Sequence, residues 1–392
     1  MANIVIITPG LLPVPSVLGG AVETLIDMFI SNTKLYQNNN ISIYTVYNSK
    51  NEEHQKYKIH CINDKKISFK VKRILRKIIN SIPKVYIGNQ YIHSVIKKMK
   101  KNCEKYDIII VENDPLFGIV LRKSFPKTKI VLHLHNDFLN EKSKLNMKAI
   151  KSYDKILPIS NALKYEIEKI DGKNKKIQVL YNGIELEKFR NVDEEKQRKL
   201  RCELQIKEKE IVFMYSGRIV PEKGVVELIE AFVELSLKDA KLVIIGKPSS
   251  KKFLRVIKKI IKNNLNIIYK EYIDYSNINY YYKIADIGII PSKCNEAFGL
   301  VVLEFLASGK PVIISDMGGM KEVASYKSRF MVKNDGNLKD NIKCAINKYL
   351  SMDKEKIGLL KKYATIDSLK FSLENYIGNF DKIIEGVINE KK

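Results

Sequence analysis

The sequence predicts an α/β protein built from two doubly wound domains, each a parallel sheet with helices on both faces. Short apolar runs rich in Ile and Val recur along the chain, and their length indicates buried strands. Segments with helical spacing alternate with these runs, which favours parallel sheets. A charged stretch over residues 185–209 separates two such series, and 392 residues are enough for two domains of ordinary size.

The first series covers residues 1–182 and is expected to form the N-terminal domain. A Gly/Pro-rich loop over 9–20 follows its first strand, and Asn182-Gly183 is a turn signal at its end. The expected strands are 4–8, 41–46, 107–112, 129–135, 155–158 and 177–180, and the expected helices are 21–33, 115–124 and 161–170.

The second series covers residues 183–367 and is expected to form the C-terminal domain. Its expected strands are 211–216, 241–245, 267–269, 287–291 and 312–315, and its expected helices are 224–237, 253–263, 276–285 and 300–308. The last stretch, at about 368–392, has the apolar spacing of an amphipathic helix.

Composition excludes several classes of protein. An apolar fraction of 45% is normal for a globular chain, so disorder is not expected. The five cysteines include no C-x-x-C pair, so neither a disulfide framework nor a zinc site is predicted. The N-terminus lacks the pattern of a secretory signal, and no apolar run is long enough to span a membrane, so a cytoplasmic location is expected.

The net charge of +25 leaves two interpretations open. The chain is rich in Lys, Asn and Ile, so compositional bias explains part of the charge, and an anionic membrane or nucleic acid would explain the rest. Residues 65–101 contain twelve basic residues and no acidic one, and apolar residues within 71–79 follow helical spacing. This pattern predicts a basic helix. It either lies on anionic lipid at the inner face of the cell membrane or packs on the core with a solvated basic face.

The segment NEAFGLVVLE at 295–304 is the most informative one. Glu296 is expected in a loop after a strand, where ligands of open α/β sheets bind. Gly299 would let a ligand approach the start of a helix, whose free N–H groups favour a phosphate. Glu304 is expected within that helix, where a carboxylate suits a neutral diol such as a ribose better than a phosphate.

Three further segments accompany this pair of carboxylates: LYNGIE at 180–185, SGRIVPEKG at 216–224 and GGMKEV at 318–323. Together the four segments resemble the motifs of retaining glycosyltransferases of family 4 (glycosyltransferase group 1), which have the GT-B fold and an E-x7-E signature. An isolated E-x7-E would occur often by chance, whereas four motifs in the right order would not. The resemblance covers nearly the whole chain.

The resemblance implies two Rossmann-like domains that face each other across a cleft. Residues 1–182 would bind the acceptor, residues 183–367 would bind a nucleotide-sugar donor, and the helix at about 368–392 would pack back on the N-terminal domain. The implied enzyme is a retaining hexosyltransferase. It would move a sugar, with a UDP-sugar as the expected donor, to a cell-envelope, polysaccharide or lipid-linked acceptor. No cofactor and no metal are expected, and the sugar, the base and the linkage stay open.

The resemblance also implies roles for particular residues. Arg218 and Lys223 would stabilise the departing diphosphate. Glu296 would act either as a nucleophile or, as the resemblance favours, as a ligand of the donor sugar. The implied catalytic set is Glu296, His135, Arg218 and Lys223, and the implied donor-binding set is Gly19, Gly20, Arg218, Lys223, Ile273, Glu296, Phe298, Gly299, Leu300, Val301 and Glu304.

His133 and His135 alternate along an expected strand, so they share one face, and His135 lies nearer the carboxyl end of the strand. In the family a histidine at this place contacts the donor sugar, so His135 is the candidate and His133 is expected to pack below it. No acidic ligand cluster accompanies them in the sequence, so a metal site is not predicted. Gly19 and Gly20 are expected to direct backbone N–H groups at the donor phosphate.

Other activities have less support. The dinucleotide fingerprint G-x-G-x-x-G is absent, which disfavours NAD binding. Another GT-B-like enzyme is the alternative within the fold, such as a nucleotide-sugar epimerase or a glycosyl phosphorylase, although no motif marks the cofactor lysine of a phosphorylase. A nucleic-acid-binding protein is the alternative from a different class. The basic residues of this chain are scattered, and the sequence contains no DNA- or RNA-binding module. No nucleic acid is therefore expected as a partner.

Overall fold

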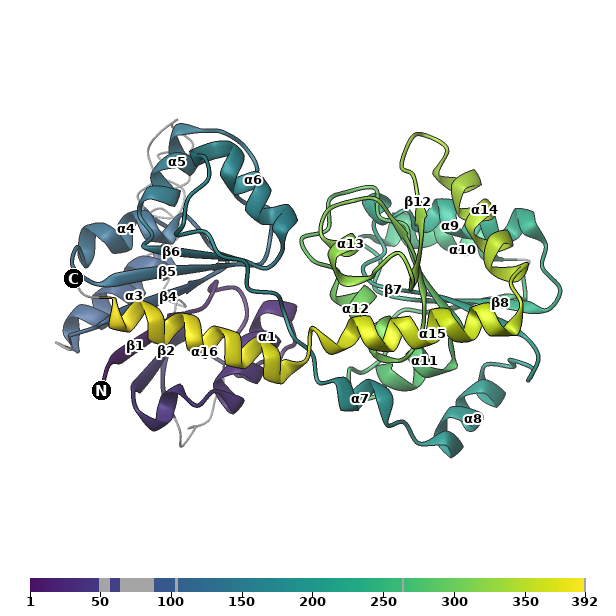
Figure 1. Ribbon diagram of the computed structural model, residues 1–392, viewed down its shortest axis with the longest axis horizontal. Helices are drawn as coiled ribbons and strands as arrows, with labels where there is room; N and C mark the ends of the chain where they lie inside the picture. The colour runs from purple at the N-terminus through teal and green to yellow at the C-terminus, as the bar shows by residue number, and fades with distance from the viewer. Residues whose placement is uncertain (49–56, 64–87, 103–104, 263, 391–392) are drawn as a thin grey trace. The chain divides into compact units, whose positions relative to one another are not determined.

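The computed structural model describes residues 1–48, 57–63, 88–102, 105–262 and 264–390. The chain divides into two compact units (Figure 1): unit 1 comprises Met1–Gly183 and Glu374–Lys392, and unit 2 comprises Ile184–Leu373. The basic helix expected around residues 71–79 lies outside the described residues. Among the helices in the described ranges, none is long and apolar enough to cross a membrane.

Unit 1 contains a parallel sheet of six strands in the order β3-β2-β1-β4-β5-β6, which is the order of the doubly wound dinucleotide-binding fold. The strands are β1 (Asn3–Ile7), β2 (Asn40–Val46), β3 (Lys58–Ile62), β4 (Ile108–Glu112), β5 (Lys129–Leu134) and β6 (Lys155–Pro158). The sequence analysis missed β3. It also predicted a strand at 177–180, where the structure has only an isolated bridge between Ile177 and Ile156.

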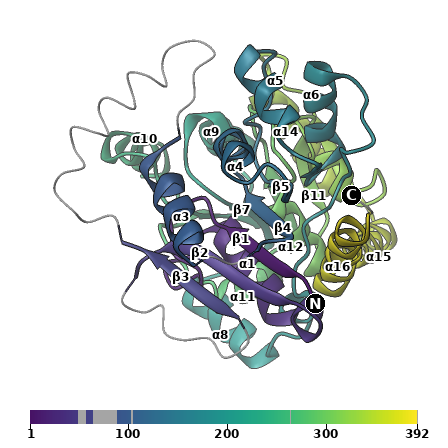
Figure 2. The same ribbon diagram turned by 90° about the vertical axis from the view of Figure 1, so that its left-hand side faces the viewer.

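Helices cover both faces of this sheet (Figure 2). The helices α3 (Gln90–Lys101), α4 (Phe117–Ser124), α5 (Lys144–Lys151) and α6 (Asn161–Asp171) share one apolar core with the strands. The other face is covered by α1 (Ala21–Asn32) and α16 (Leu373–Asn389). The ring centroids of Phe29 in α1 and Phe380 in α16 lie 4.4 Å apart, and Thr33 Oγ1 donates to the Asp381 carboxylate at 2.6 Å. The last helix of the chain therefore completes the core of unit 1.

Unit 2 repeats the arrangement, with the strand order β12-β11-β10-β7-β8-β9. The strands are β7 (Ile211–Ser216), β8 (Ala240–Ile245), β9 (Ile267–Lys270), β10 (Ile287–Ile290), β11 (Val312–Ser315) and β12 (Arg329–Val332). The helices α9 (Val225–Leu235), α10 (Lys251–Ile261) and α14 (Leu338–Leu350) pack on one face. The other face carries α7 (Leu186–Arg190), α11 (Ile278–Ile284), α12 (Leu300–Ala307) and α15 (Lys354–Leu369). The short helices α8 (Glu194–Glu203) and α13 (Met320–Val323) complete the unit.

Each sheet has one point at which the strand order reverses. It lies between β1 and β4 in unit 1 and between β7 and β10 in unit 2. Loops that leave the carboxyl ends of such a strand pair diverge, and ligands of open α/β sheets bind there. The loops that follow these four strands are therefore the expected ligand-binding region of each unit.

Candidate active site

The reversal point of unit 2 gathers four of the predicted residues. Arg218 and Lys223 follow β7, and Glu296 follows β10. Glu304 lies on α12, directly after the loop that carries Glu296. The Arg218 guanidinium is exposed and makes no hydrogen bond or ion pair with any residue in the described ranges.

Lys223 and Glu296 form an ion pair. Glu296 Oε1 accepts hydrogen bonds from Lys223 Nζ and from Ser292 Oγ. The side chains of Lys223 and Glu296 are 15% and 18% exposed, so most of the pair is removed from water. The predicted cation and carboxylate, 73 residues apart in the chain, thus belong to one cluster. Ser292 is a member that the sequence analysis missed, although its place directly after β10 was visible.

Two glycines hold the backbone of Glu296 in place. Gly319 N–H donates to the Glu296 carbonyl oxygen at 2.7 Å. Gly318 has a φ of +67°, and a Cβ atom at this position would lie 2.1 Å from the same carbonyl oxygen. Only glycine fits this close approach, so the segment GGMKEV acts on the site by positioning the loop of Glu296.

Glu304 belongs to a second polar cluster. Its Oε2 accepts a hydrogen bond from Tyr282 Oη on α11. Burial raises the pKa of Glu304 to about 7, against the lowering effects of the Tyr282 bond and of the Lys188 charge. The Tyr282 ring packs edge-on against Phe305, with centroids 4.6 Å apart, which fixes the hydroxyl. Glu304 is therefore a carboxyl group that changes charge near neutral pH, and its partner Tyr282 was not predicted.

The start of α12 presents the N-terminal N–H groups of a helix. Gly299 precedes the helix with a φ of +103°, and Leu300 and Val301 form the half-buried first turn. Phe298 is buried, and its ring centroid lies 5.5 Å from that of Phe371, so its side chain belongs to the core of unit 2. Only the backbone of Phe298 remains for ligand binding.

The remaining predicted donor residues lie in loops after strands. Ile273 follows β9 and is half-buried. In unit 1, Gly19 and Gly20 precede α1, are exposed, and have φ of +74° and +104°. The Gly19 N–H donates to the Ser16 carbonyl at 2.9 Å, so this amide is already hydrogen-bonded within its own turn.

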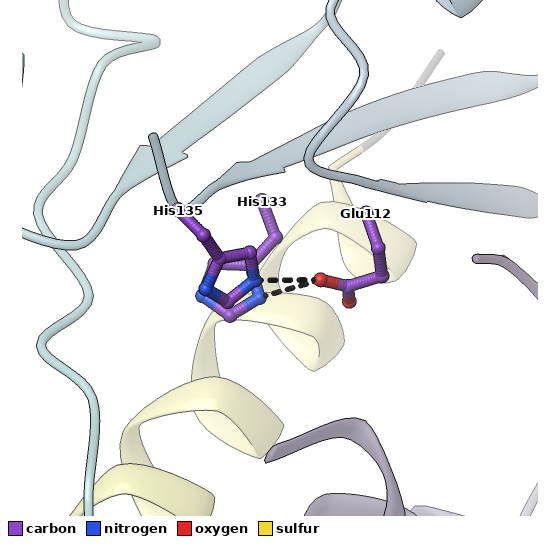
Figure 3. Close-up of side chains that lie close together, drawn as sticks. All are labelled: Glu112, His133 and His135. Carbon is purple, nitrogen blue, oxygen red and sulfur yellow. Dashed lines mark hydrogen bonds and ion pairs between the residues drawn. The ribbon is translucent and has the colours of Figure 1, made fainter. Parts of the chain in front are cut away.

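Three polar side chains meet on the face of the unit 1 sheet that α16 covers (Figure 3). Glu112 Oε2 lies 3.0 Å from His133 Nδ1 and 2.9 Å from His135 Nε2. All three residues are buried, and the His133 ring centroid lies 5.1 Å from that of Phe380. The two histidine rings are 4.1 Å apart, which confirms that they share a face.

The expectation that no acidic residue accompanies the histidines is wrong. Glu112 stands 23 positions before His135 and becomes a neighbour only because β4 and β5 pair in register, with Glu112 opposite His133. The ligand atoms of the three residues lie within 4.8 Å of one another, and these residue types also bind zinc. The 2.9 Å contact is a hydrogen bond between Glu112 and His135, whereas His133 Nδ1 lies 3.0 Å from the same oxygen without hydrogen-bond geometry, and neither ring nitrogen of His133 has a hydrogen-bond partner within the described residues.

Burial sets the charges of this group. It lowers the pKa of His135 to about 4, and the repulsion from His133 acts in the same direction. Burial alone would raise the pKa of Glu112, but the attraction of His133 and the close polar contacts with both rings outweigh it and lower that pKa to about 2. At neutral pH an ionised Glu112 therefore accepts a hydrogen bond from Nε2 of a neutral His135.

Comparison with known proteins places this geometry in a family. A family model described as glycosyl transferases group 1 matches residues 196–365, and one described as glycosyltransferase family 4 matches residues 41–188. The lipopolysaccharide 1,2-N-acetylglucosaminetransferase of Salmonella typhimurium is 27% identical over 356 residues, which cover 86% of each chain.

Solved structures show the same fold at low sequence identity. The sucrose-phosphate synthase of Thermosynechococcus elongatus matches with a TM-score of 0.77 at 17% identity, over 100% of both chains. HepE of Anabaena, in complex with UDP and glucose, matches with a TM-score of 0.76 at 17% identity, over 98% of this chain and 100% of that one. Their fold and the two family models agree with the two six-stranded sheets described above. The chain belongs to the group 1 glycosyltransferases and has their two-domain GT-B fold.

Proposed function

We propose that this glycosyltransferase moves a hexosyl group from a UDP-sugar to a cell-envelope, polysaccharide or lipid-linked acceptor, with retention of anomeric configuration. The observation that carries the proposal is the pairing of Lys223 with Glu296 beside Arg218, at the reversal point of the unit 2 sheet. The donor class is supported by the Anabaena structure, which holds UDP and glucose. The acceptor class is supported by the Salmonella relative, which is named as a lipopolysaccharide transferase.

Unit 2 is the proposed donor domain. Arg218 and Lys223 bind the diphosphate together with the N–H groups at the start of α12, where a helix favours an anion. The guanidinium of Arg218 makes no hydrogen bond or ion pair within the described chain, so it can bind a phosphate without breaking one. Lys223 is paired with Glu296, and binding a phosphate oxygen weakens that ion pair. Glu304 accepts hydrogen bonds from the ribose hydroxyls.

In the proposed reaction the bond between the anomeric carbon and the phosphate oxygen breaks, and its electron pair leaves with the diphosphate. Positive charge develops at the anomeric carbon, and the Glu296 carboxylate stabilises it. The acceptor hydroxyl forms the new bond on the same face and passes its proton to the departing phosphate oxygen. Arg218 and Lys223 neutralise the leaving group, so a divalent metal is not required.

Unit 1 is the proposed acceptor domain, and it supplies His135 as a contact for the donor sugar. Because Nε2 of His135 is bonded to Glu112, Nδ1 is the nitrogen that remains for a sugar hydroxyl. We place the enzyme on the cytoplasmic face of the cell membrane, with the basic segment 65–101 as a contact for anionic lipid.

Nucleotide binding tests the proposal directly. In a thermal-shift panel of UDP, GDP and ADP, UDP is expected to raise the melting temperature most. Incubation with UDP-sugars and envelope glycan acceptors is then expected to release UDP and to form a product with the donor's anomeric configuration, read by NMR. Conversion of the UDP-sugar without release of UDP would instead identify an epimerase. The absence of binding to every nucleoside diphosphate would remove the donor-site assignment.

A further inference from the structure

The helix α10 of unit 2 separates its basic and apolar side chains completely. At 100° per residue, its cations fall within an arc of roughly 120° around the helix axis. The apolar side chains Phe253, Ile257, Ile260 and Ile261 pack in the core of unit 2. The helix is therefore held with its basic face directed outward. The cations on that face are Lys251, Lys252, Arg255, Lys258, Lys259 and the capping Lys262.

These six side chains, hereafter the α10 basic face, have no acidic partners. All six are exposed, and within the described part of the chain none makes a hydrogen bond or an ion pair. Residues 240–270 contain nine Lys and Arg and no Asp or Glu. Other helices of unit 2 differ, because Lys339 and Lys343 both pair with Glu234. Acidic residues pair with these two lysines of α14, whereas within the described residues none pairs with the cations of α10. Compositional bias alone does not predict this contrast.

We propose that the α10 basic face docks unit 2 on an anionic lipid surface. Six cations on one outward-facing arc repel one another, and a planar anionic surface neutralises several of them at once. Apolar side chains accompany the charge: Val256 is 42% exposed beside the arc, and Leu265, three residues beyond the cap, is 91% exposed. The single aromatic residue of the helix, Phe253, packs in the core, so it offers no ring for stacking on nucleic acid bases.

This contact is independent of the donor site and adds a second lipid contact, on unit 2, to the one proposed for residues 65–101. It predicts that unit 2 carries part of the membrane affinity of the full chain. The attraction is electrostatic, so it weakens as salt rises and the screening length shortens to roughly 3 Å at 1 M.

Two charge-matched variants of the full chain test the proposal. The first replaces Lys252, Arg255, Lys259 and Lys262 with Gln. The control replaces four exposed lysines at separate sites of the same unit with Gln, namely Lys238, Lys333, Lys354 and Lys362. Each variant lowers the net charge of +25 by four. Co-sedimentation with vesicles of phosphatidylglycerol and phosphatidylcholine is compared with phosphatidylcholine alone.

The α10 variant is expected to partition onto the anionic vesicles at least about tenfold more weakly than wild type. The control variant is expected to partition within about twofold of wild type. Equal partitioning of wild type and the α10 variant would overturn the proposal. An equal loss in both variants would also overturn it, because the binding would then follow net charge alone. Binding of single-stranded RNA that only the α10 variant loses, with unchanged vesicle binding, would reassign the face to nucleic acid. Melting temperatures confirm folding, and UDP calorimetry on the same proteins keeps failure of the donor site distinct from failure of this surface.

Discussion

The carboxylate of Glu112 accepts a hydrogen bond from Nε2 of His135 at 2.9 Å, across two neighbouring strands of unit 1. This bond fixes which nitrogen of a buried, neutral imidazole carries the proton, as carboxylates do for many functional histidines. Glu112 is in this sense a positioning residue for His135, and the relationship can be tested apart from catalysis.

Replacing Glu112 with Gln is expected to leave the tautomer of His135 no longer fixed. A carboxamide offers both a donor and an acceptor, so His135 is no longer held with its proton on Nε2. The imidazole ¹⁵N shifts of His135 at neutral pH are expected to move from those of one tautomer to those of a mixture. Leaving buried groups poorly paired also costs about 1–3 kcal/mol of stability. Asp137→Asn, an exposed acid in the following loop, is the control. Identical ¹⁵N shifts in wild type and Glu112→Gln would contradict the assignment.

Removing either cation of the donor site is expected to weaken UDP binding. Arg218→Ala and Lys223→Ala each lose a charge-assisted contact, so the dissociation constant measured by calorimetry should rise roughly tenfold to a hundredfold. Arg218→Lys should restore only part of the affinity, because a lysine lacks the planar fork. Lys356→Ala removes an exposed cation paired with Asp353 in the same unit and should bind UDP as wild type does. Wild-type affinity in both alanine variants would exclude these residues from the diphosphate site.

Glu304 is expected to make UDP binding depend on pH around neutrality. Its pKa is raised to about 7, so the carboxyl group gains its charge as pH rises through that value. The ionised form accepts hydrogen bonds from the ribose more strongly, so affinity should increase between about pH 6 and 8. Glu304→Gln resembles the protonated form, and its affinity should fall about tenfold at pH 8 and much less at pH 6. The titration of UDP itself is common to both proteins, so parallel pH profiles would argue against a ribose contact.

Gly318→Ala is expected to displace the loop of Glu296. The added Cβ would lie 2.1 Å from the Glu296 carbonyl oxygen, and the φ of +67° is unfavourable for alanine. Gly336→Ala is a matched control, since its φ is +89° but no heavy atom lies within 4 Å of the added Cβ. Both variants should lose about 1 kcal/mol or more from backbone strain. Only Gly318→Ala should also lose UDP-sugar affinity, and equal binding by the two variants would show that the glycine does not position Glu296.

Transfer is expected to continue after removal of divalent metals. Arg218 and Lys223 place two positive charges at the proposed diphosphate, which is the task that Mg²⁺ or Mn²⁺ performs in metal-dependent enzymes. Rates measured after dialysis against EDTA should stay within about twofold of the untreated enzyme. A complete loss that Mg²⁺ or Mn²⁺ restores would overturn this prediction.

The central strands could be predicted because a buried parallel strand needs a continuous apolar run. The run at 211–216 coincides with β7 (Ile211–Ser216). The strands that the sequence analysis missed, β3 and β12, lie at the edges of the two sheets. An edge strand is covered less completely, so it tolerates polar residues such as the exposed Lys58 and the half-buried Arg329, and the apolar signal disappears.

Residues of the candidate site could be predicted from the sequence only where they belong to a recognisable motif. Arg218, Lys223, Glu296 and Glu304 stand in segments with fixed spacing. The polar partners of His133 and Glu304 do not, because the parallel register sets Glu112 against His133, and helix packing brings Tyr282 to Glu304. Such pairs depend on tertiary contacts that a single sequence does not encode in its spacing.

The position of α16 has a consequence for how the protein is made. Phe29 of α1 and His133 of β5 pack against Tyr376 and Phe380, which come from the last helix of the chain. On the ribosome, residues 1–183 emerge long before these aromatic side chains are synthesised. One apolar face of the first unit therefore stays open to solvent and to chaperones during translation of the whole second unit. The first unit finishes folding only after α16 has left the exit tunnel.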